Sequence, residues 1–154
     1  MEKTLAMKLL EGKKVAYTAV TYPTTERDAV KVAEALDVPP PQLYKTLVVI
    51  HPTDKPFLVM VPGPSQLDLK KLAKAVGAKK LKMATHEEAQ ALTGLQVGGI
   101  SALAVGKRPF RVYLDTSAKQ HKAIYISAGQ RGINLKVGVN ALLKVVNGRW
   151  VEAI

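Results

Sequence analysis

Cysteine is absent from this 154-residue sequence, and long apolar runs are absent as well. Without cysteine the chain has no disulfide bonds, thiolate metal sites or cysteine nucleophile, and such a composition is typical of a reducing compartment, so we expect cytoplasmic residence. The longest apolar runs, at 47–50 and 57–61, are far below the roughly 20 residues that a membrane helix needs. We therefore expect no membrane segment, and the N-terminal stretch lacks the apolar core of a signal peptide.

Acidic residues are scarce relative to basic ones, because 12 Asp and Glu stand against 23 Lys and Arg, for a formal net charge of +11. This balance favours a polyanionic partner. A generally basic protein without such a partner is the alternative. The basic residues gather in two groups that suit either phosphate contacts or solvated faces. These groups are Lys70, Lys71, Lys74, Lys79, Lys80 and Lys82, and Lys107, Arg108 and Arg111.

The common catalytic motifs are also missing. His51, His86 and His121 lie without HExxH or similar spacing, so we expect no metal centre. There is no GxSxG elbow, no GxxxxGK[ST] loop and no GxGxxG after an expected strand. The sequence therefore disfavours a nucleotide-dependent enzyme, and we expect no cofactor.

Capping residues and apolar spacing predict five helices. Thr4 caps the first, Thr25 and Asp28 resemble a capping box for the second, and Thr85 with Glu88 forms another for the fourth. The predicted ranges are about 5–11, 25–36, 69–76, 85–94 and 140–146, the last capped by Asn140.

Short β segments fill the remainder of the chain. Residues 51–56 have the composition of a turn, so the strands on either side are expected to form a hairpin. Hairpin-linked strands with inserted helices predict an α+β fold: one domain over residues 1–154, with a curved antiparallel or mixed sheet partly covered by helices. The predicted strands are about 15–22, 43–50, 57–61, 110–115, 123–127 and 133–137.

One strand, LYKTLVVI at 43–50, carries a lysine among apolar residues. Because side chains alternate between the two faces of a strand, Lys45 shares a face with Leu43 and Leu47. An ammonium directed into such surroundings needs an anionic partner or must line a cavity. Alternatively, Lys45 lies near the strand end and extends its charged head into water.

Two glycine-containing turns are candidate ligand loops. In LQVGGIS, Gly98 and Gly99 permit close approach of a ligand to the peptide N–H groups. In ISAGQRG, the candidates are a hydroxyl, an open turn and a cation, supplied by Ser127, Gly129 and Arg131. Either segment could equally be a plain turn.

Together with Lys45, these segments resemble the YbaK/EbsC family of aminoacyl-tRNA deacylases, relatives of the editing domain inserted in bacterial prolyl-tRNA synthetases. The likeness spans nearly the whole chain, through several separated blocks in the expected order. These blocks are AMKLLEGKKVAYTAVTYP, LYKTLVV, QLDLKKLAKAVGAKKLKMA, TGLQVGGIS and AIYISAGQRGINL.

The resemblance implies a curved, barrel-like mixed sheet with surrounding helices and a pocket in which Lys45 is the catalytic residue. The nucleophile would be the sulfur of a substrate cysteine or a positioned water, while the Gly98 and Gly99 amides would hold the substrate carbonyl. The substrate-binding positions implied by the same resemblance are Tyr22, Thr46, Gly98, Gly99, Ile100, Ser101, Ser127, Gly129 and Arg131, with Asn134 as a further pocket position.

Three departures from the family pattern put the selected amino acid in question. Ala102 stands where a proline is common, Ala128 where a glycine is common, and Asn134 where YbaK-like relatives have an acidic residue. The resemblance implies trans-editing of Cys-tRNA(Pro). The alternatives are Ala-tRNA(Pro) or another small aminoacyl-tRNA, a non-catalytic RNA-binding module, and a small-molecule-binding protein. The expected partner is the acceptor end of aminoacyl-tRNA, and prolyl-tRNA synthetase is a further candidate.

Overall fold

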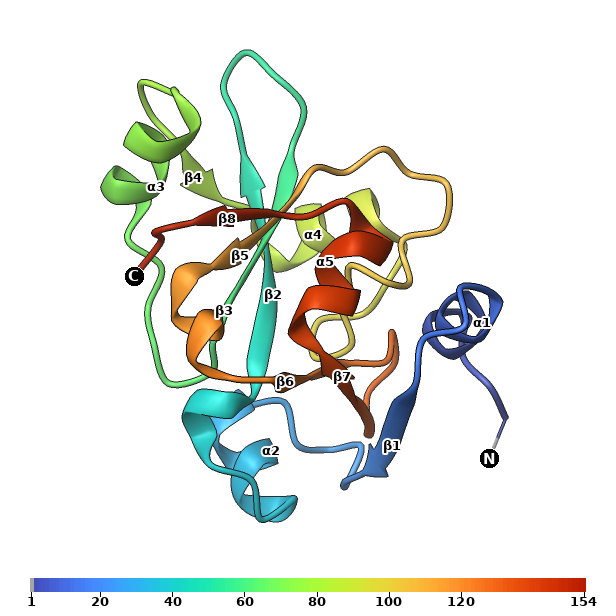
Figure 1. The fold of residues 1–154 in the computed structure, drawn as a ribbon. Coiled ribbons are helices and arrows are strands. Elements are labelled where there is room, and N and C mark those ends of the chain that lie inside the picture. The colour runs from blue at the N-terminus through green and yellow to red at the C-terminus, as the bar shows by residue number, and fades with distance from the viewer. Residues whose placement is uncertain (1) are drawn as a thin grey trace.

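The computed structural model describes residues 2–154 and shows an α+β fold of two β-sheets with helices around them (Figure 1). The larger sheet has the strand order β4-β2-β3-β5-β8, with antiparallel pairs at β4-β2-β3 and parallel pairs at β3-β5-β8. This confirms the predicted hairpin across 51–56. The strand bounds are β2 (Tyr44–Ile50), β3 (Phe57–Pro62), β4 (Lys82–Met83), β5 (Val112–Asp115) and β8 (Arg149–Val151).

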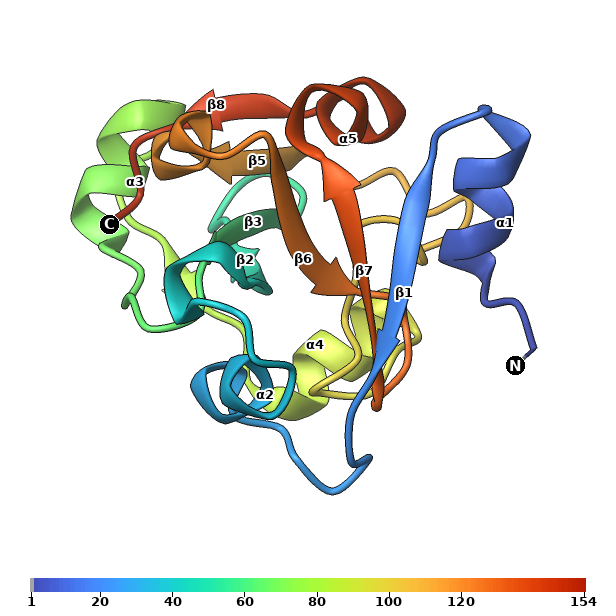
Figure 2. The same cartoon turned by 60° about the horizontal axis from the view of Figure 1, so that its bottom comes forward.

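The smaller sheet is antiparallel, with the order β1-β7-β6. Its strands are β1 (Tyr17–Thr21), β6 (Ala123–Ser127) and β7 (Ile133–Gly138). Strand β1 is shorter than the predicted range of 15–22. Figure 2 shows this sheet beside the larger one, with β6 next to β2.

The barrel-like closure expected from the resemblance is not found. Strand β6 packs beside β2, but among the described residues the backbone pairing between them is one parallel bridge between Leu43 and Tyr125, just before β2 begins. A single bridge does not continue the hydrogen-bonded ladder from one sheet into the other, so the described chain has two separate sheets.

Five α-helices cover these sheets: α1 (Leu5–Gly12), α2 (Ala29–Ala35), α3 (Leu69–Val76), α4 (His86–Thr93) and α5 (Val139–Val146). Two short 3-10 turns, Pro40–Gln42 and Thr116–Gln120, complete the set. The predicted capping box at Thr85 and Glu88 is confirmed, with each side chain accepting from the other residue's backbone N–H. None of the helices within residues 2–154 has the length and apolar character to cross a membrane.

Two predicted caps were wrong. Asp28, not Thr25, caps α2, because its Oδ1 accepts from the backbone N–H groups of Val30 and Lys31. Helix α5 starts directly after β7 with Gly138 as its N-cap, so Asn140 already lies inside the helix. In both cases the helix begins at a different residue from the one that the local capping pattern predicted.

The core surrounds the fully buried strand β3. On one face, Leu58 and Met60 belong to the cluster that includes the smaller sheet and α1, α4 and α5. On the other face, Val59 and Val61 pack in a cluster with α3. This two-sided burial explains why β3 is apolar at every position rather than alternating.

Replacing Thr85 by Ala should lower the free energy of unfolding by about 1 kcal/mol, because the N–H of Glu88 loses its capping oxygen. Thr85→Ser keeps a hydroxyl and should stay close to wild type. Urea denaturation of both variants measures this difference, and equal stability of the two would contradict the capping role.

Candidate functional site

A cavity of about 710 Å³ opens beside the uncovered edge of β2. Strand β4 pairs only with Val49 and Ile50, and Val48 accepts a hydrogen bond from the N–H of Ala84. Within the described chain no strand pairs with the rest of this edge, so residues from both faces of β2 line the cavity. The backbone carbonyl of Val48 points toward β4, and backbone groups two residues apart on a strand point in the same direction. The backbone N–H and C=O of Thr46 therefore face the open edge.

Lys45 lines this cavity, and its Nζ donates to the backbone carbonyl of Gly63, 3.0 Å away. Burial lowers the pKa of Lys45 below its ordinary value, and the nearby carboxylate of Asp28 partly offsets this effect. The ammonium is thus half-buried next to a neutral acceptor, with no carboxylate within 4.0 Å among the described residues. Such a cation retains capacity to bind a further oxygen.

Asp28 is the only carboxylate among the described residues that line the cavity. Asp28 directly precedes Ala29, the first residue of α2, and Ala29 packs closely against Gly63. A Cβ added to Gly63 would lie only 3.0 Å from the Cβ of Ala29. The contact brings the start of α2 against the residue that accepts from Lys45. The sequence marked Asp28 only as the partner of Thr25 in a capping box and gave no sign of this neighbourhood.

Tyr22 and Asn134 lie deep in the cavity. Tyr22 is 9% exposed, and burial raises the pKa of its phenol, so the hydroxyl stays protonated and can donate a hydrogen bond. Asn134 is 4% exposed on β7, and its Oδ1 has no hydrogen-bond partner among the described residues. An unpaired buried carbonyl oxygen is costly unless a ligand or water completes it.

The two glycine turns pack against each other at one side of the cavity. The Nε of Arg131 donates to the carbonyl of Val97 at 2.7 Å. A Cβ added to Gly99 would lie 2.9 Å from backbone atoms of Gln130 and Arg131, so only glycine fits without movement of the turns. The N–H of Gly99 donates to the carbonyl of Gln96 at 2.8 Å and is therefore already used.

The predicted site residues thus fall into two sets. Those that line the cavity are Tyr22, Lys45, Thr46, Gly98, Ile100, Ser127 and Asn134. The others pack behind the lining and hold the two turns: Gly99, Ser101, Gly129 and Arg131. Of the three departures from the family pattern, Asn134 alone lines the cavity, while Ala102 and Ala128 are buried elsewhere.

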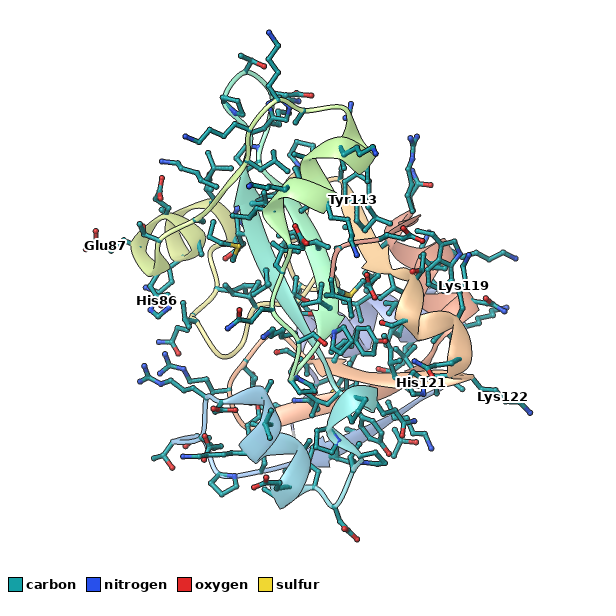
Figure 3. All side chains as sticks on the ribbon, turned by 90° about the vertical axis from the view of Figure 1, so that its left-hand side faces the viewer. His86, Glu87, Tyr113, Lys119, His121 and Lys122 are labelled. Carbon is teal, nitrogen blue, oxygen red and sulfur yellow. The ribbon has the colours of Figure 1, made fainter. Side chains whose placement is uncertain are left out.

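Sequence reasoning missed several residues of the cavity wall. Arg27 and Asp28 precede α2, Ser65 follows β3, and His86 starts α4. Figure 3 shows His86 at the start of α4, on the opposite side of the view from His121. Within residues 2–154, no three His, Asp or Glu side chains gather in an arrangement that could hold a metal ion. The sequence placed His86 at the start of a helix, and that position alone gives no reason to expect a residue of a binding site.

Comparisons with known proteins identify the family of this chain. Residues 24–145 match the aminoacyl-tRNA editing domain family. The chain is 38% identical over 153 residues to EbsC of Enterococcus faecalis, assigned as a candidate Cys-tRNA(Pro)/Cys-tRNA(Cys) deacylase, covering 98% of this chain and 93% of that one. The chain therefore belongs to the aminoacyl-tRNA editing domain family.

Two further relatives show the same fold and its wider setting. The crystal structure of a candidate trans-editing enzyme for prolyl tRNA synthetase superposes with a TM-score of 0.85 at 25% identity, over 99% of this chain and 98% of that one. The proline--tRNA ligase of Pediococcus pentosaceus is 32% identical over 107 residues, which is 69% of this chain and 19% of the ligase. The similar part is thus one segment of a much larger synthetase.

Gly99→Ala should lower the free energy of unfolding by about 1–3 kcal/mol, since its Cβ would collide with backbone atoms of the neighbouring turn. Gly12→Ala is the matched control, because nothing lies within 4 Å of its added Cβ. Chemical denaturation compares the two. If Gly99→Ala is as stable as Gly12→Ala, the turns are not held at this contact.

Asp28→Asn should lower the pKa of Lys45 further, because it removes the carboxylate that favours the charged ammonium. Asn remains a good helix cap, so α2 should persist. Titration of ε-¹³C-labelled lysine by NMR measures this shift, with the Lys45 signal assigned from its absence in Lys45→Met. Asp37→Asn, just beyond α2, removes the same charge away from the cavity lining. An equal shift in both variants would contradict a local effect.

Proposed function

We propose that this chain is a trans-editing deacylase that cleaves the ester of mischarged aminoacyl-tRNA, with Cys-tRNA(Pro) as its substrate. The observation that carries the proposal is the half-buried ammonium of Lys45 in a cavity large enough for an aminoacylated ribose. Membership of the editing family and the similarity to EbsC support this choice of reaction. The proposed reaction uses no cofactor.

Ester cleavage needs a nucleophile and a group that stabilises the developing oxygen charge. In the first route, the thiolate of the substrate cysteine attacks its own carbonyl carbon. A carbon–sulfur bond forms, the bond to the ribose oxygen breaks, and a cyclic thioester leaves while the ribose oxygen takes up a proton. In the second route, water adds to the carbonyl and the products are cysteine and tRNA with a free terminal hydroxyl.

We assign Lys45 to the oxygen on which charge develops. Its ammonium is held by the Gly63 carbonyl, so the positive charge is in place before the reaction begins. The lowered pKa makes this ammonium a better proton donor to the leaving ribose oxygen than an exposed lysine would be. Lys45 would therefore serve either route without acting as the nucleophile.

The other lining residues have positioning roles in this proposal. Gly98 lies at a backbone φ of +92° in the cavity wall, and we assign its amide to the substrate carbonyl. The family resemblance assigned Gly99 a similar part, but its N–H is bonded to Gln96, so we assign it to support of the turn. The open edge at Thr46 and the phenol of Tyr22 would hold the aminoacyl and ribose groups.

Asn134 bears on which amino acid is accepted. Its unpaired Oδ1 can accept a hydrogen bond, and a cysteine thiol can donate one whereas an alanine methyl cannot. This favours Cys-tRNA(Pro) over Ala-tRNA(Pro), which is the second candidate. The similarity to part of proline--tRNA ligases supports prolyl-tRNA synthetase as the source of the mischarged tRNA and as a candidate partner. A reaction on aminoacyl-tRNA would place the protein in the cytoplasm.

The experiment is deacylation of Cys-tRNA(Pro), Ala-tRNA(Pro) and Pro-tRNA(Pro) by wild type, Lys45→Ala and the control Lys8→Ala on α1. We expect rapid loss of Cys-tRNA(Pro) with wild type and Lys8→Ala. Lys45→Ala should lose about 100-fold or more in rate, the cost of removing one preorganised charge.

Survival of all three substrates at wild-type enzyme would overturn the deacylase proposal for this panel and favour an RNA-binding module. Preferential loss of Ala-tRNA(Pro) would reassign the substrate and keep the reaction. Full activity of Lys45→Ala would remove Lys45 from the catalytic residues.

A further inference from the structure

A line of lysines leads along the sheet edge to the mouth of the cavity. Lys79, Lys80 and Lys82 are exposed, and together with the exposed Met83 we call them the β4 ridge. Buried Leu81, at 6% exposed, anchors the segment between them in the cluster under α3. The lysines therefore stand outward from a fixed backbone rather than on a loose tail.

The geometry of β4 joins this ridge to the site. Val49 pairs with Met83 and Ile50 with Lys82, so the ridge continues the sheet at the edge that the cavity opens along. Met83 is both 38% exposed and part of the cavity lining, next to Ala84. A nucleic-acid strand that leaves the cavity past Met83 therefore reaches Lys82, the neighbouring residue of β4.

The charges of the ridge are free to bind an external anion. Within residues 2–154 the ion pairs are Lys3 with Glu11 and Arg111 with Asp54, and neither involves the ridge. The pKa of Glu88 is lowered mainly by the hydrogen bond from the backbone N–H of Thr85, and the nearby charge of Lys82 adds a smaller effect in the same direction. The Oε1 of Glu88, however, already accepts from the N–H of Thr85 in the capping box.

The position and chemistry of the ridge suit a nucleic-acid strand. Lys80 lies just before β4 and Lys82 begins it, with buried Leu81 between them, so both lysines are directed outward from the same short segment. Met83 offers apolar surface for a base at the rim of the cavity. Arg27, whose side chain lies next to Gly98, adds a positive charge to the cavity wall. Phosphate contacts of this kind give affinity without reading sequence.

We infer that the β4 ridge binds the phosphate backbone of the tRNA acceptor strand and guides its aminoacylated end into the cavity. This inference rests on the proposed function and adds the direction from which the RNA enters. Figure 1 places β4 and α3 on one side of the molecule and α1 on the other, and Figure 2 again shows α3 on the opposite side from α1. The ridge therefore has a control surface of equal charge at α1, which contributes no residue to the cavity lining.

The test compares two triple variants that each remove three positive charges. One replaces Lys79, Lys80 and Lys82 by Gln, and the control replaces Lys8, Lys13 and Lys14 around the end of α1, all exposed, by Gln. The first measurement is the affinity for uncharged tRNA at several salt concentrations. We expect the ridge variant to bind about 10-fold or more weakly, with a salt slope reduced by roughly 2 because three single-strand contacts are lost. The control should bind like wild type.

The second measurement is deacylation of full-length Cys-tRNA(Pro) and of the cysteinyl ester of the trinucleotide CCA. The ridge variant should show a raised KM on the tRNA but an unchanged rate on the trinucleotide ester, which is too short to reach all three lysines. A merely structural defect would lower both rates.

Equal losses of tRNA affinity in both triple variants, or wild-type affinity in the ridge variant, would overturn the inference. Equal losses on tRNA and on the trinucleotide ester would also overturn it. Failure of the proposed function is distinguishable, because wild type would then cleave neither substrate, while the binding measurement would still decide whether the ridge holds RNA.

Discussion

The contact between the Lys45 ammonium and the Gly63 carbonyl is the constraint around which the site is organised. It requires a lysine on an interior strand, an adjacent residue without a side chain, and a cavity that keeps the ammonium half-buried. Each requirement has a structural source. Strand β4 is too short to cover β2, and Gly63 lets Ala29 approach closely. A longer β4 would fill the edge with backbone pairing and leave no room for a ligand.

Close packing at glycine also shapes the wall of the cavity formed by the two turns. Gly99 and Gly129 have little room for a side chain, and Arg131 ties its turn to Val97. Gly99 faces the backbone of Gln130 and Arg131, Gly129 faces Ala104, and none of the three lines the cavity, so their influence on a ligand passes through the position of Gly98 and Ile100. Packing of two turns thus fixes a wall that neither turn could hold alone, since isolated glycine-containing loops are flexible.

Local patterns predicted the parts of the fold that depend on neighbours in sequence. The helix around Leu72, the Thr85 capping box and the hairpin across 51–56 are examples, and all three are present. Patterns failed where long-range packing decides. Strand β8 is only three residues long and pairs in parallel with β5, which no local motif announces. The barrel-like closure, which the family resemblance implied, is not found, because a single bridge at Leu43 does not continue the ladder between the two sheets.

The site shows the same division. Lys45 stood out because a charge interrupts an apolar strand, and the two glycine turns stood out by composition. Asp28 and His86 did not, because a residue at a helix start has an ordinary capping or solvent role in most proteins. Only the three-dimensional approach of α2 and α4 to β2 makes them part of the cavity wall. The unpaired Oδ1 of Asn134 is likewise a property of packing.

In the proposed reaction the Lys45 ammonium receives the aminoacylated end of the RNA. The most direct measurement is the affinity of wild type and Lys45→Met for two ligands, uncharged tRNA(Pro) and a non-hydrolysable tRNA(Pro) carrying cysteine through an amide. The account predicts that wild type prefers the amide-linked cysteinyl tRNA and that Lys45→Met loses this preference while keeping its affinity for uncharged tRNA. An unchanged preference in Lys45→Met would contradict the account, because the aminoacyl group would then be bound without the lysine.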